Sequence, residues 1–480
     1  MGASRTIVGN ALSLLTSDVM NRATTFVLYA LVARNLGAFE FGQLSLALTF
    51  FYTFQVLAAA GLKTLITREV AKDRTKTGRY LANGSAVVVT ASLLSIATLA
   101  LLVRLLSYSP QTSSVILLLA LGLLPYSLSA VCEGIFQAWE RMHLIAVANV
   151  PVNVAKIALA FLILSRGYGL WQLVILLLAC QVAILLIEWT LMARCIPAGA
   201  GFRLDRTFSL ALVRSTSTFL GIDGIIAVMS SLNIFLLSKL AGEREVGLYS
   251  AAVQLMVPVT LVFQSVVLSV FPLMCRRFEP SLQGLKQIAE RLIAMLLAVA
   301  LPAVIGLVFL AAPALVLLYG EPDFALAAGA LRIVSWNLLL AALTSVLGQV
   351  LVASLRERVT LRIVAANTLV GLLLGVVLIS QFGLIGAAIS ALATKLVDFV
   401  QHYVPVSRQL AGVGLRRALW RPAIAGACMA AYLVAARDQN LVFVVVSAAA
   451  LYAAVMLALV IWASGGPRQL KARYTYLWSE

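Results

Sequence analysis

Long runs of apolar residues, separated by short polar stretches, extend over almost the whole chain. Most runs are about 20 residues or longer, the length at which an α-helix crosses the hydrocarbon core of a bilayer. The pattern predicts about fourteen transmembrane helices at residues 11–34, 40–61, 80–106, 111–138, 144–165, 168–194, 214–239, 246–274, 291–317, 326–354, 359–380, 383–407, 421–436 and 441–463. The expected fold class is therefore an all-α membrane protein with no soluble domain.

Composition supports this class. Of 480 residues, 62% are hydrophobic and only 11% are charged, whereas a soluble globular chain carries about 25% charged residues. The first apolar run follows Arg5 and lacks a small-residue cleavage site, so we expect it to remain in the membrane as the first helix.

The net charge of +17 is distributed unevenly along the chain. With the N-terminus placed inside, most Lys and Arg residues fall in the inside loops, and the outside loops hold only Arg34, Arg166, Lys239, Arg244 and Arg437. This asymmetry follows the positive-inside rule. It predicts a multi-pass protein of a bacterial or archaeal cytoplasmic membrane with both termini cytoplasmic. The basic residues then contact anionic lipid headgroups, and no nucleic acid is expected as a partner.

Two stretches of the chain resemble one another. Residues 34–47 read RNLGAFEFGQLSLA and residues 239–252 read KLAGEREVGLYSAA, and the same offset aligns Asp18 with Asp223. A second block aligns Asn153 with Asn367, and residues 168–170 with residues 382–384. Since six helices separate the copies, both halves enter the membrane in the same direction, as in transporters built from parallel repeats.

The repeat predicts three parts. Residues 1–200 form one six-helix bundle, residues 201–410 form a second, and residues 411–480 add two helices and a cytoplasmic tail. Two such bundles around a central cavity suit alternating access.

Several short stretches stand out from the apolar runs: residues 33–37 (ARNLG), 40–42 (EFG), 61–62 and 68–69, 136–141 (FQAWER) and 383–388 (GLIGAA). In their order and spacing they resemble the polysaccharide flippases of the multidrug/oligosaccharidyl-lipid/polysaccharide (MOP) exporter superfamily. Ala138 departs from the glycine that many relatives carry. The resemblance implies two six-helix bundles and movement of an undecaprenyl-diphosphate-linked sugar, often coupled to an ion gradient. In some relatives the last two helices form a groove for the lipid tail.

Three cations, Arg22, Lys156 and Lys395, lie near the middle of apolar helices. A charge at mid-bilayer costs about 2.5–3.5 kcal/mol on insertion scales, so each should face a cavity or a partner. One hypothesis is that all three bind the diphosphate or an acidic sugar of the substrate. The alternative is pairing within the protein, since Asp18 precedes Arg22 by one turn, and Lys395 shares a helix face with Asp398 and His402.

Other polar residues extend this candidate site. Asn149 and Asn153 share a helix face with Lys156 and either bind sugar hydroxyls or bond neighbouring helices. Arg332, near the outer end of its helix, either lines the cavity rim or snorkels to the interface.

Carboxylates within the helices are candidates for ion coupling. Asp18, Asp223 and Asp398 can each carry a proton or join carbonyl oxygens around sodium, and the sequence does not choose between these ions. Glu133 and Glu188 lie near the cytoplasmic ends of their helices, where we expect them to reach the interface.

Catalytic patterns are missing from the sequence. Its two histidines and five scattered cysteines show no metal spacing, and neither a nucleophile elbow nor a phosphate loop is present. The sequence therefore predicts a transporter and not an enzyme, without a cofactor other than a proton or sodium gradient. We expect a monomer that flips lipid-linked oligosaccharide among membrane lipids. The alternatives are a small-molecule, multidrug or lipid exporter of the same superfamily, or a membrane polymerase or ligase, for which the outside loops are short.

Overall fold

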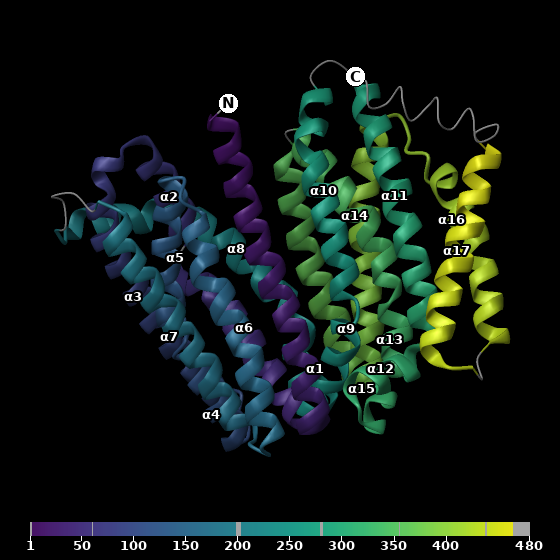
Figure 1. The fold of residues 1–480 in the computed structure, drawn as a ribbon, viewed down its shortest axis with the longest axis horizontal. Helices are drawn as coiled ribbons and strands as arrows, with labels where there is room; N and C mark the ends of the chain where they lie inside the picture. The colour runs from purple at the N-terminus through teal and green to yellow at the C-terminus, as the bar shows by residue number, and fades with distance from the viewer. Residues whose placement is uncertain are drawn as a thin grey trace. The chain divides into compact units, whose positions relative to one another are not determined.

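The structure is a computed structural model that describes residues 2–59, 61–197, 203–278, 282–354, 356–436 and 439–463. The side chains of residues 2–18, 217–219, 222, 272, 277–278, 357–358 and 361 lie outside the description. Helices joined by short connections make up these residues. Their bounds (Figure 1) are α1 Gly2–Ala59, α2 Leu62–Lys72, α3 Thr77–Leu105, α4 Pro110–Ala120, α5 Leu123–Ala138, α6 His143–Ser165, α7 Leu170–Cys195, α8 Arg206–Leu240, α9 Glu243–Gln254, α10 Val257–Phe278, α11 Leu282–Phe309, α12 Ala311–Tyr319, α13 Ala328–Val334, α14 Trp336–Ala353, α15 Glu357–Gln409, α16 Leu415–Ala435 and α17 Leu441–Ala463, with 3-10 turns at Arg74–Lys76 and Pro322–Ala327.

Twelve segments among the described residues are long and apolar enough to cross a membrane. The all-α membrane class is therefore confirmed, whereas the number fourteen stays a prediction. α1 and α15 each contain one glycine outside the helical region, Gly37 with φ 76° and Gly383 with φ 51°. Glycine adopts positive φ without the Cβ clash that other residues meet. The breaks lie between predicted helices 11–34 and 40–61, and at the start of predicted helix 383–407.

Prolines explain why other predicted helices are divided. α4, α9 and α11 end four or five residues before Pro125, Pro258 and Pro313, respectively. Proline lacks the amide hydrogen, and its ring collides with the carbonyl one turn earlier. Pro151 and Pro302 lie inside α6 and α11, so a proline does not end every helix.

Packing divides the chain into two compact units. The N-terminal unit comprises Met1–Ser250 with Tyr319–Glu321, and the C-terminal unit comprises Ala251–Leu318 with Pro322–Glu480. α8 packs on α1 and α3 within the N-terminal unit. The boundaries predicted from the repeat, 1–200, 201–410 and 411–480, stay predictions.

In the N-terminal unit, α1 is the central helix and packs on α3, α4, α5, α6 and α8, while α5 also packs on α2 and α7. A buried apolar cluster under α2 includes Leu62, Ile66, Ile135 and Phe136, all with no exposed surface. These contacts hold α5, α6 and α7 around the second half of α1 and so position the cavity described below.

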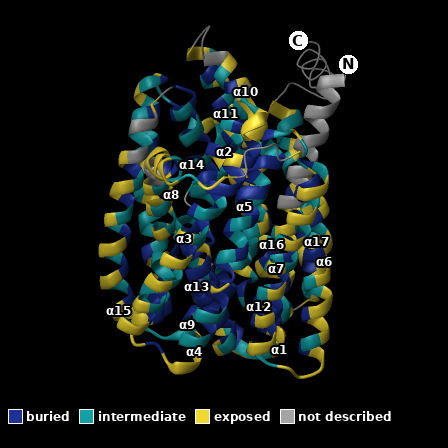
Figure 2. Ribbon diagram, turned by 90° about the vertical axis from the view of Figure 1, so that its left-hand side faces the viewer, coloured by how far each residue is buried: buried dark blue, intermediate teal, exposed yellow. Residues whose placement is uncertain are grey.

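In the C-terminal unit, α11 packs on α10, α14 and α16, α14 packs on α15, and α16 packs on α17. The Tyr452 hydroxyl of α17 donates to the Ala298 carbonyl of α11 at 2.9 Å. Exposed residues run along α15 (Figure 2), and Leu369, Leu373 and Val377 are among its large apolar ones. An exposed row of large apolar side chains suits contact with acyl chains.

The backbone supports the predicted repeat. Gly37 and Gly242 occupy equivalent positions in the two copies, and both have positive φ, 76° and 94°. In the second block, Gly169 caps α7 in an extended conformation and its counterpart Gly383 breaks α15. Equivalent positions thus take non-helical conformations in both copies.

Candidate binding cavity

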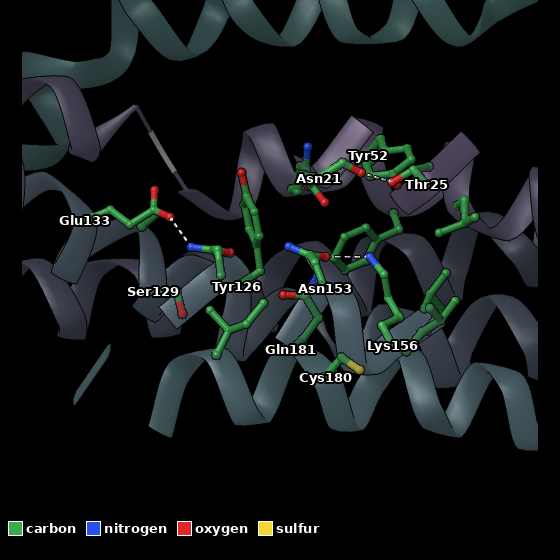
Figure 3. Close-up of a pocket in the computed structure, with 18 of the residues that line it drawn as sticks. Asn21, Thr25, Tyr52, Tyr126, Ser129, Glu133, Asn153, Lys156, Cys180 and Gln181 are labelled. Atoms are coloured by element: carbon green, nitrogen blue, oxygen red, sulfur yellow. Dashed lines mark hydrogen bonds between the residues drawn. The ribbon is translucent and has the colours of Figure 1, made fainter. Parts of the chain in front are cut away.

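The N-terminal unit encloses a cavity of about 390 Å³ between α1, α2, α4, α5, α6 and α7 (Figure 3). Polar side chains contribute more than half of its lining residues: Asn21, Thr25, Tyr52, Gln55, Lys63, Tyr126, Ser129, Glu133, Asn149, Asn153, Lys156 and Gln181. The remainder is mostly apolar: Leu28, Leu48, Phe51, Leu119, Ala130, Ile145, Leu177, Cys180 and Ile184. Such a lining is unusual in helices of this hydropathy, because lone polar groups in hydrocarbon are costly.

Helical spacing explains how these side chains converge. Asn149, Asn153 and Lys156 of α6 lie at i, i+4 and i+7, and all three line the cavity. Asn21 and Thr25 have the same relationship on α1. Residues one or two turns apart share a helix face, so a few polar residues on each apolar helix suffice to build one polar wall.

Lys156 lies at one end of the labelled row in Figure 3. Its Nζ donates to Asn153 Oδ1 at 2.7 Å, and Asn153 is 4% exposed. Within the described part of the chain, Lys156 forms no ion pair. An ammonium held by a neutral amide has no carboxylate partner to give up and is suited to bind an anion.

Glu133 lies at the other end of the row (Figure 3). Its carboxylate pairs with the ammonium of Lys63. Asn149 Nδ2 lies 3.4 Å from Glu133 Oε1 and 3.4 Å from Glu188 Oε1. We call Lys63, Glu133, Asn149 and Glu188 the carboxylate cluster.

The expectation that Glu188 reaches the interface is wrong, because its side chain has no exposed surface. It continues the face of α7 that carries Gln181 and Ile184, both cavity residues, and α5 and α6 cover that face. The side chain of Glu133 is 20% exposed and lines the cavity. The spacing of residues 181, 184 and 188 is the sequence signal that would have placed Glu188 inside.

Other sequence-predicted residues of this unit lie outside the cavity lining. Arg22 is half-buried and adjoins the cavity residue Asn21 without lining the cavity itself. Asp223 of α8 is exposed, and the side chain of Asp18 lies outside the described residues. Their proposed roles stay predictions.

The C-terminal unit brings Lys395 and Asp398 together. Lys395 Nζ lies 2.7 Å from Asp398 Oδ2, and Asp398 Oδ1 accepts from Asn367 Nδ2 at 2.8 Å and lies 3.1 Å from His402 Nδ1. This is the internal pairing that the helical spacing offered as the alternative to substrate binding. Arg332 is exposed, and its Nε donates to the Val308 carbonyl at 3.3 Å.

The predicted residues thus form separate groups. Asn149, Asn153 and Lys156 lie together in the N-terminal unit, and Lys395 with Asp398 lies in the C-terminal unit. Convergence of Arg22, Lys156 and Lys395 on one chamber stays a prediction. Sequence reasoning missed Tyr52 and Gln55 of α1, Tyr126 of α5 and Gln181 of α7. Their helical spacing to other lining residues, such as Tyr126 to Ser129 and Glu133, is the signal that could have found them.

We compared the chain with protein-family models, curated proteins and solved structures. A family model described as polysaccharide biosynthesis protein matches residues 7–278. No curated protein matches the chain.

Solved structures match over most of the chain. An inward-closed structure of the lipid II flippase MurJ is 13% identical, covers 94% of this chain and 97% of its own, and has a TM-score of 0.70. An inward-facing multidrug resistance MATE family transporter of the MOP superfamily is 16% identical, covers 81% and 95%, and has a TM-score of 0.65. A MOP superfamily transporter from Pyrococcus furiosus is 14% identical, covers 85% and 95%, and has a TM-score of 0.57.

At such identities the matched structures show the fold alone, and the three structures named here are transporters and a flippase. The predicted resemblance is therefore confirmed by two separate comparisons. The family model spans more than half of the 480 residues, including every helix that lines the cavity. The chain belongs to the polysaccharide biosynthesis protein family and has the fold of MOP superfamily transporters.

Proposed function

We propose that this protein is a flippase that moves undecaprenyl-diphosphate-linked oligosaccharide from the cytoplasmic to the outer leaflet by alternating access, coupled to an ion gradient. The observation that carries the proposal is the polar cavity of about 390 Å³ inside an apolar helical bundle. Both termini would be cytoplasmic, as the distribution of Lys and Arg predicts.

The cavity chemistry suits a sugar. Amides of Asn21, Gln55, Asn149 and Gln181 offer donors and acceptors together, which matches the mixed donor and acceptor character of sugar hydroxyls. Among the apolar walls these groups would fix the orientation of the ligand, as a few convergent polar groups do in small-molecule sites.

Lys156 supplies a positive charge for an anionic headgroup. Because its ammonium bonds the amide of Asn153 and not a carboxylate, exchange of Asn153 for a diphosphate oxygen loses only a neutral partner. A hydrogen bond between ionised groups is roughly twice as strong as a neutral one. The exchange is therefore favourable, and Asn153 becomes free to bond the sugar.

A multidrug or lipid exporter is the main alternative, since the fold is shared with MATE family transporters. The match to the polysaccharide biosynthesis family favours the oligosaccharide substrate. The cavity is also rich in amides, whereas an apolar drug would need a mostly apolar lining.

A leaflet-resolved assay tests the proposal. Purified protein would be placed in liposomes with undecaprenyl diphosphate that carries a fluorescent N-acetylglucosamine, and a membrane-impermeant quencher would report the outer leaflet. Lys156→Ala and Arg22→Ala should slow flipping, and the exposed Arg104→Ala should leave the rate unchanged. Equal rates in liposomes with and without wild-type protein would refute the flippase.

A further inference from the structure

Two carboxylates and one ammonium meet where α2, α5, α6 and α7 converge. Lys63 pairs with Glu133, and Glu188 lies on the other side of Asn149. If all three groups are ionised, the carboxylate cluster has one negative charge in excess, and the surplus rests on the member with no exposed surface, Glu188.

The hydrogen bonds of Asn149 do not satisfy Glu188. Nδ2 carries two hydrogens but faces three acceptors, the Ile145 carbonyl at 3.1 Å and the two carboxylates at 3.4 Å each. Glu188 Oε2 is buried without a hydrogen bond of good geometry in the described structure, and the Ser129 hydroxyl, which faces Glu188 from α5, is likewise buried without one. Ser129 lies one turn before Glu133 on α5.

A buried carboxylate without sufficient donors is strongly unfavourable when ionised, whereas its protonated form gains a donor of its own. We propose that Glu188 holds a proton and that gain or loss of this proton sets the affinity of the cavity for an anionic headgroup. The inference deepens the proposed function and rests on it for the identity of the anion.

The elements packed against Glu188 contribute the other groups of this charge balance. α6 presents the neutral Asn149 and carries the cation Lys156 two turns further along the cavity, and Pro110–Ala120 of α4 contains no titratable residue. The titratable groups that face the cluster from the other elements are Lys63 of α2, Cys132, Tyr126 and Glu133 of α5, and Tyr52 of α1. Lys63 is the one cation among them, and it is already paired with Glu133.

The geometry favours a proton over a metal cation. Glu188 does not line the cavity, and its side chain is fully buried, so an ion that keeps several oxygen ligands in the cavity does not reach it directly. A proton needs only one lone pair and a nearby acceptor. Glu133 lines the cavity, so water there reaches the cluster, and Asn149 separates Glu133 from Glu188.

Protonation changes the charge that a bound anion meets. With Glu188 protonated the cluster is neutral, since Lys63 balances Glu133. When Glu188 releases its proton to cavity water, leaving a carboxylate and a hydronium ion, the cluster becomes negative and repels a diphosphate in the same cavity. Proton and anion binding are then linked reciprocally, and one added charge changes affinity on the order of tenfold.

Infrared difference spectroscopy tests protonation without any need for transport. A pH step applied to purified protein in lipid nanodiscs should show a protonated-carboxyl stretching band in wild type that is lost in Glu188→Gln. The band should persist in Glu69→Gln, whose glutamate lies outside the cavity and pairs with Arg68 and Lys72. Persistence of the band in Glu188→Gln would overturn the assignment.

Binding of undecaprenyl diphosphate in the same nanodiscs tests the linkage, with uncharged undecaprenol as the reference ligand. Wild-type affinity for the diphosphate should fall about tenfold once Glu188 is deprotonated, while Glu188→Gln should show no such dependence on pH. Equal dependence of affinity on pH in the two proteins would overturn the linkage. An affinity that depends on sodium concentration and not on pH would mean that sodium, and not a proton, is the linked ion.

A second variant covers the case in which Glu188→Gln does not fold. In Lys63→Met the cation is gone, so Glu133 becomes the next group to take a proton, and the carboxyl band should grow. An unchanged band would contradict the charge balance of the cluster. If wild-type protein does not flip lipid but the band behaves as expected, the proposed function fails and the proton site stands.

Discussion

Gly42 of α1 and Gly247 of α9 lie backbone against backbone. Gly42 contacts Glu243 and Gly247 contacts Ala38, and Ala38 and Glu243 are equivalent positions in the two copies of the repeat. A Cβ added to Gly42 would lie 1.8 Å from the carbonyl oxygen of Glu243, and one added to Gly247 would lie 2.0 Å from that of Ala38. The two contacts are reciprocal, as across a local two-fold axis. Small residues permit such close approach of transmembrane helices, which gives a physical reason for glycine in both copies.

Substitution of either Gly42 or Gly247 should destabilise the N-terminal unit. In Gly42→Ala the new methyl group collides with backbone, which cannot rotate away as a side chain can, so the two segments must separate. We expect a loss of about 1–3 kcal/mol, typical of overpacking, seen as a lower Tm in detergent. Gly247→Ala should behave alike because the contact is reciprocal.

Gly221→Ala is the matched control. Gly221 lies within α8, and a Cβ there meets no atom within 4 Å. Alanine favours the helix over glycine by up to about 1 kcal/mol, so Tm should stay constant or rise. An equal loss of Tm in both variants would contradict the importance of the Gly42–Gly247 contact.

Much of the fold follows from local pattern. The length of the apolar runs predicts the membrane helices. Gly37 and Gly383 lie in the short gaps between predicted helices, where a glycine is a local signal for a break in the helix. The ends of α4, α9 and α11 also have a local cause in the proline that follows each.

The candidate site was predictable only in part. Asn149, Asn153 and Lys156 share one helix face, so spacing alone predicts that they act together. The pairing of Lys63 with Glu133 joins residues that lie far apart in the sequence, and spacing within one helix says nothing about such contacts. Glu188 was misplaced because a position near a helix end was read as exposed, whereas the packing of α5 and α6 decides it.

Lys156→Met should weaken binding of charged ligand selectively. Of the two lysines that line the cavity, Lys156 is the one whose ammonium has no carboxylate partner in the described structure. A hydrogen bond to a charged group contributes about 1.5–3 kcal/mol. Affinity for undecaprenyl diphosphate in nanodiscs should therefore fall on the order of 10- to 100-fold. Affinity for undecaprenol should be unchanged, and Arg104→Met should alter neither. A parallel loss for both lipids would indicate a structural effect.

Lys395→Met should act mainly through stability. The substitution removes the ammonium from Asp398 and leaves that carboxylate with Asn367 and His402. Loss of one partner of a buried pair costs about 3–5 kcal/mol. The side chains of Lys395 and Asp398 are 32% and 15% exposed, so solvent screening reduces the expected loss to about 1–2 kcal/mol.

The double variant Lys395→Met/Asp398→Asn separates the two roles of Lys395. Asparagine removes the unpaired charge, so Tm should recover most of the loss. A flipping rate that recovers with Tm supports a structural pair. If flipping stays lost while Tm recovers, Lys395 binds substrate as the sequence first suggested.

Asp205 should stabilise the start of α8 in a pH-dependent way. Its carboxylate accepts from the amides of Thr207 and Phe208 at 3.0 and 3.2 Å and pairs with Arg79 at 2.8 Å. Bonds from the Thr207 hydroxyl, the Phe208 amide and Arg79 hold the pKa of Asp205 at about 2, below the ordinary value of about 3.9. A carboxylate with a depressed folded-state pKa stabilises the protein above its unfolded pKa, and the contribution is lost as pH falls through the folded pKa.

Asp205→Asn tests this dependence, because asparagine keeps an acceptor for the helix amides but cannot ionise. At pH 7 the variant should melt below wild type by on the order of a degree or two, since the charge on the N-terminus of α8 and the pairing with Arg79 are both lost. Between about pH 4 and pH 2 the wild-type carboxylate takes up its proton, so the difference in Tm should shrink toward zero. A difference that stays constant down to pH 2 would mean that the charge of Asp205 contributes nothing, and that capping geometry alone stabilises this end of α8.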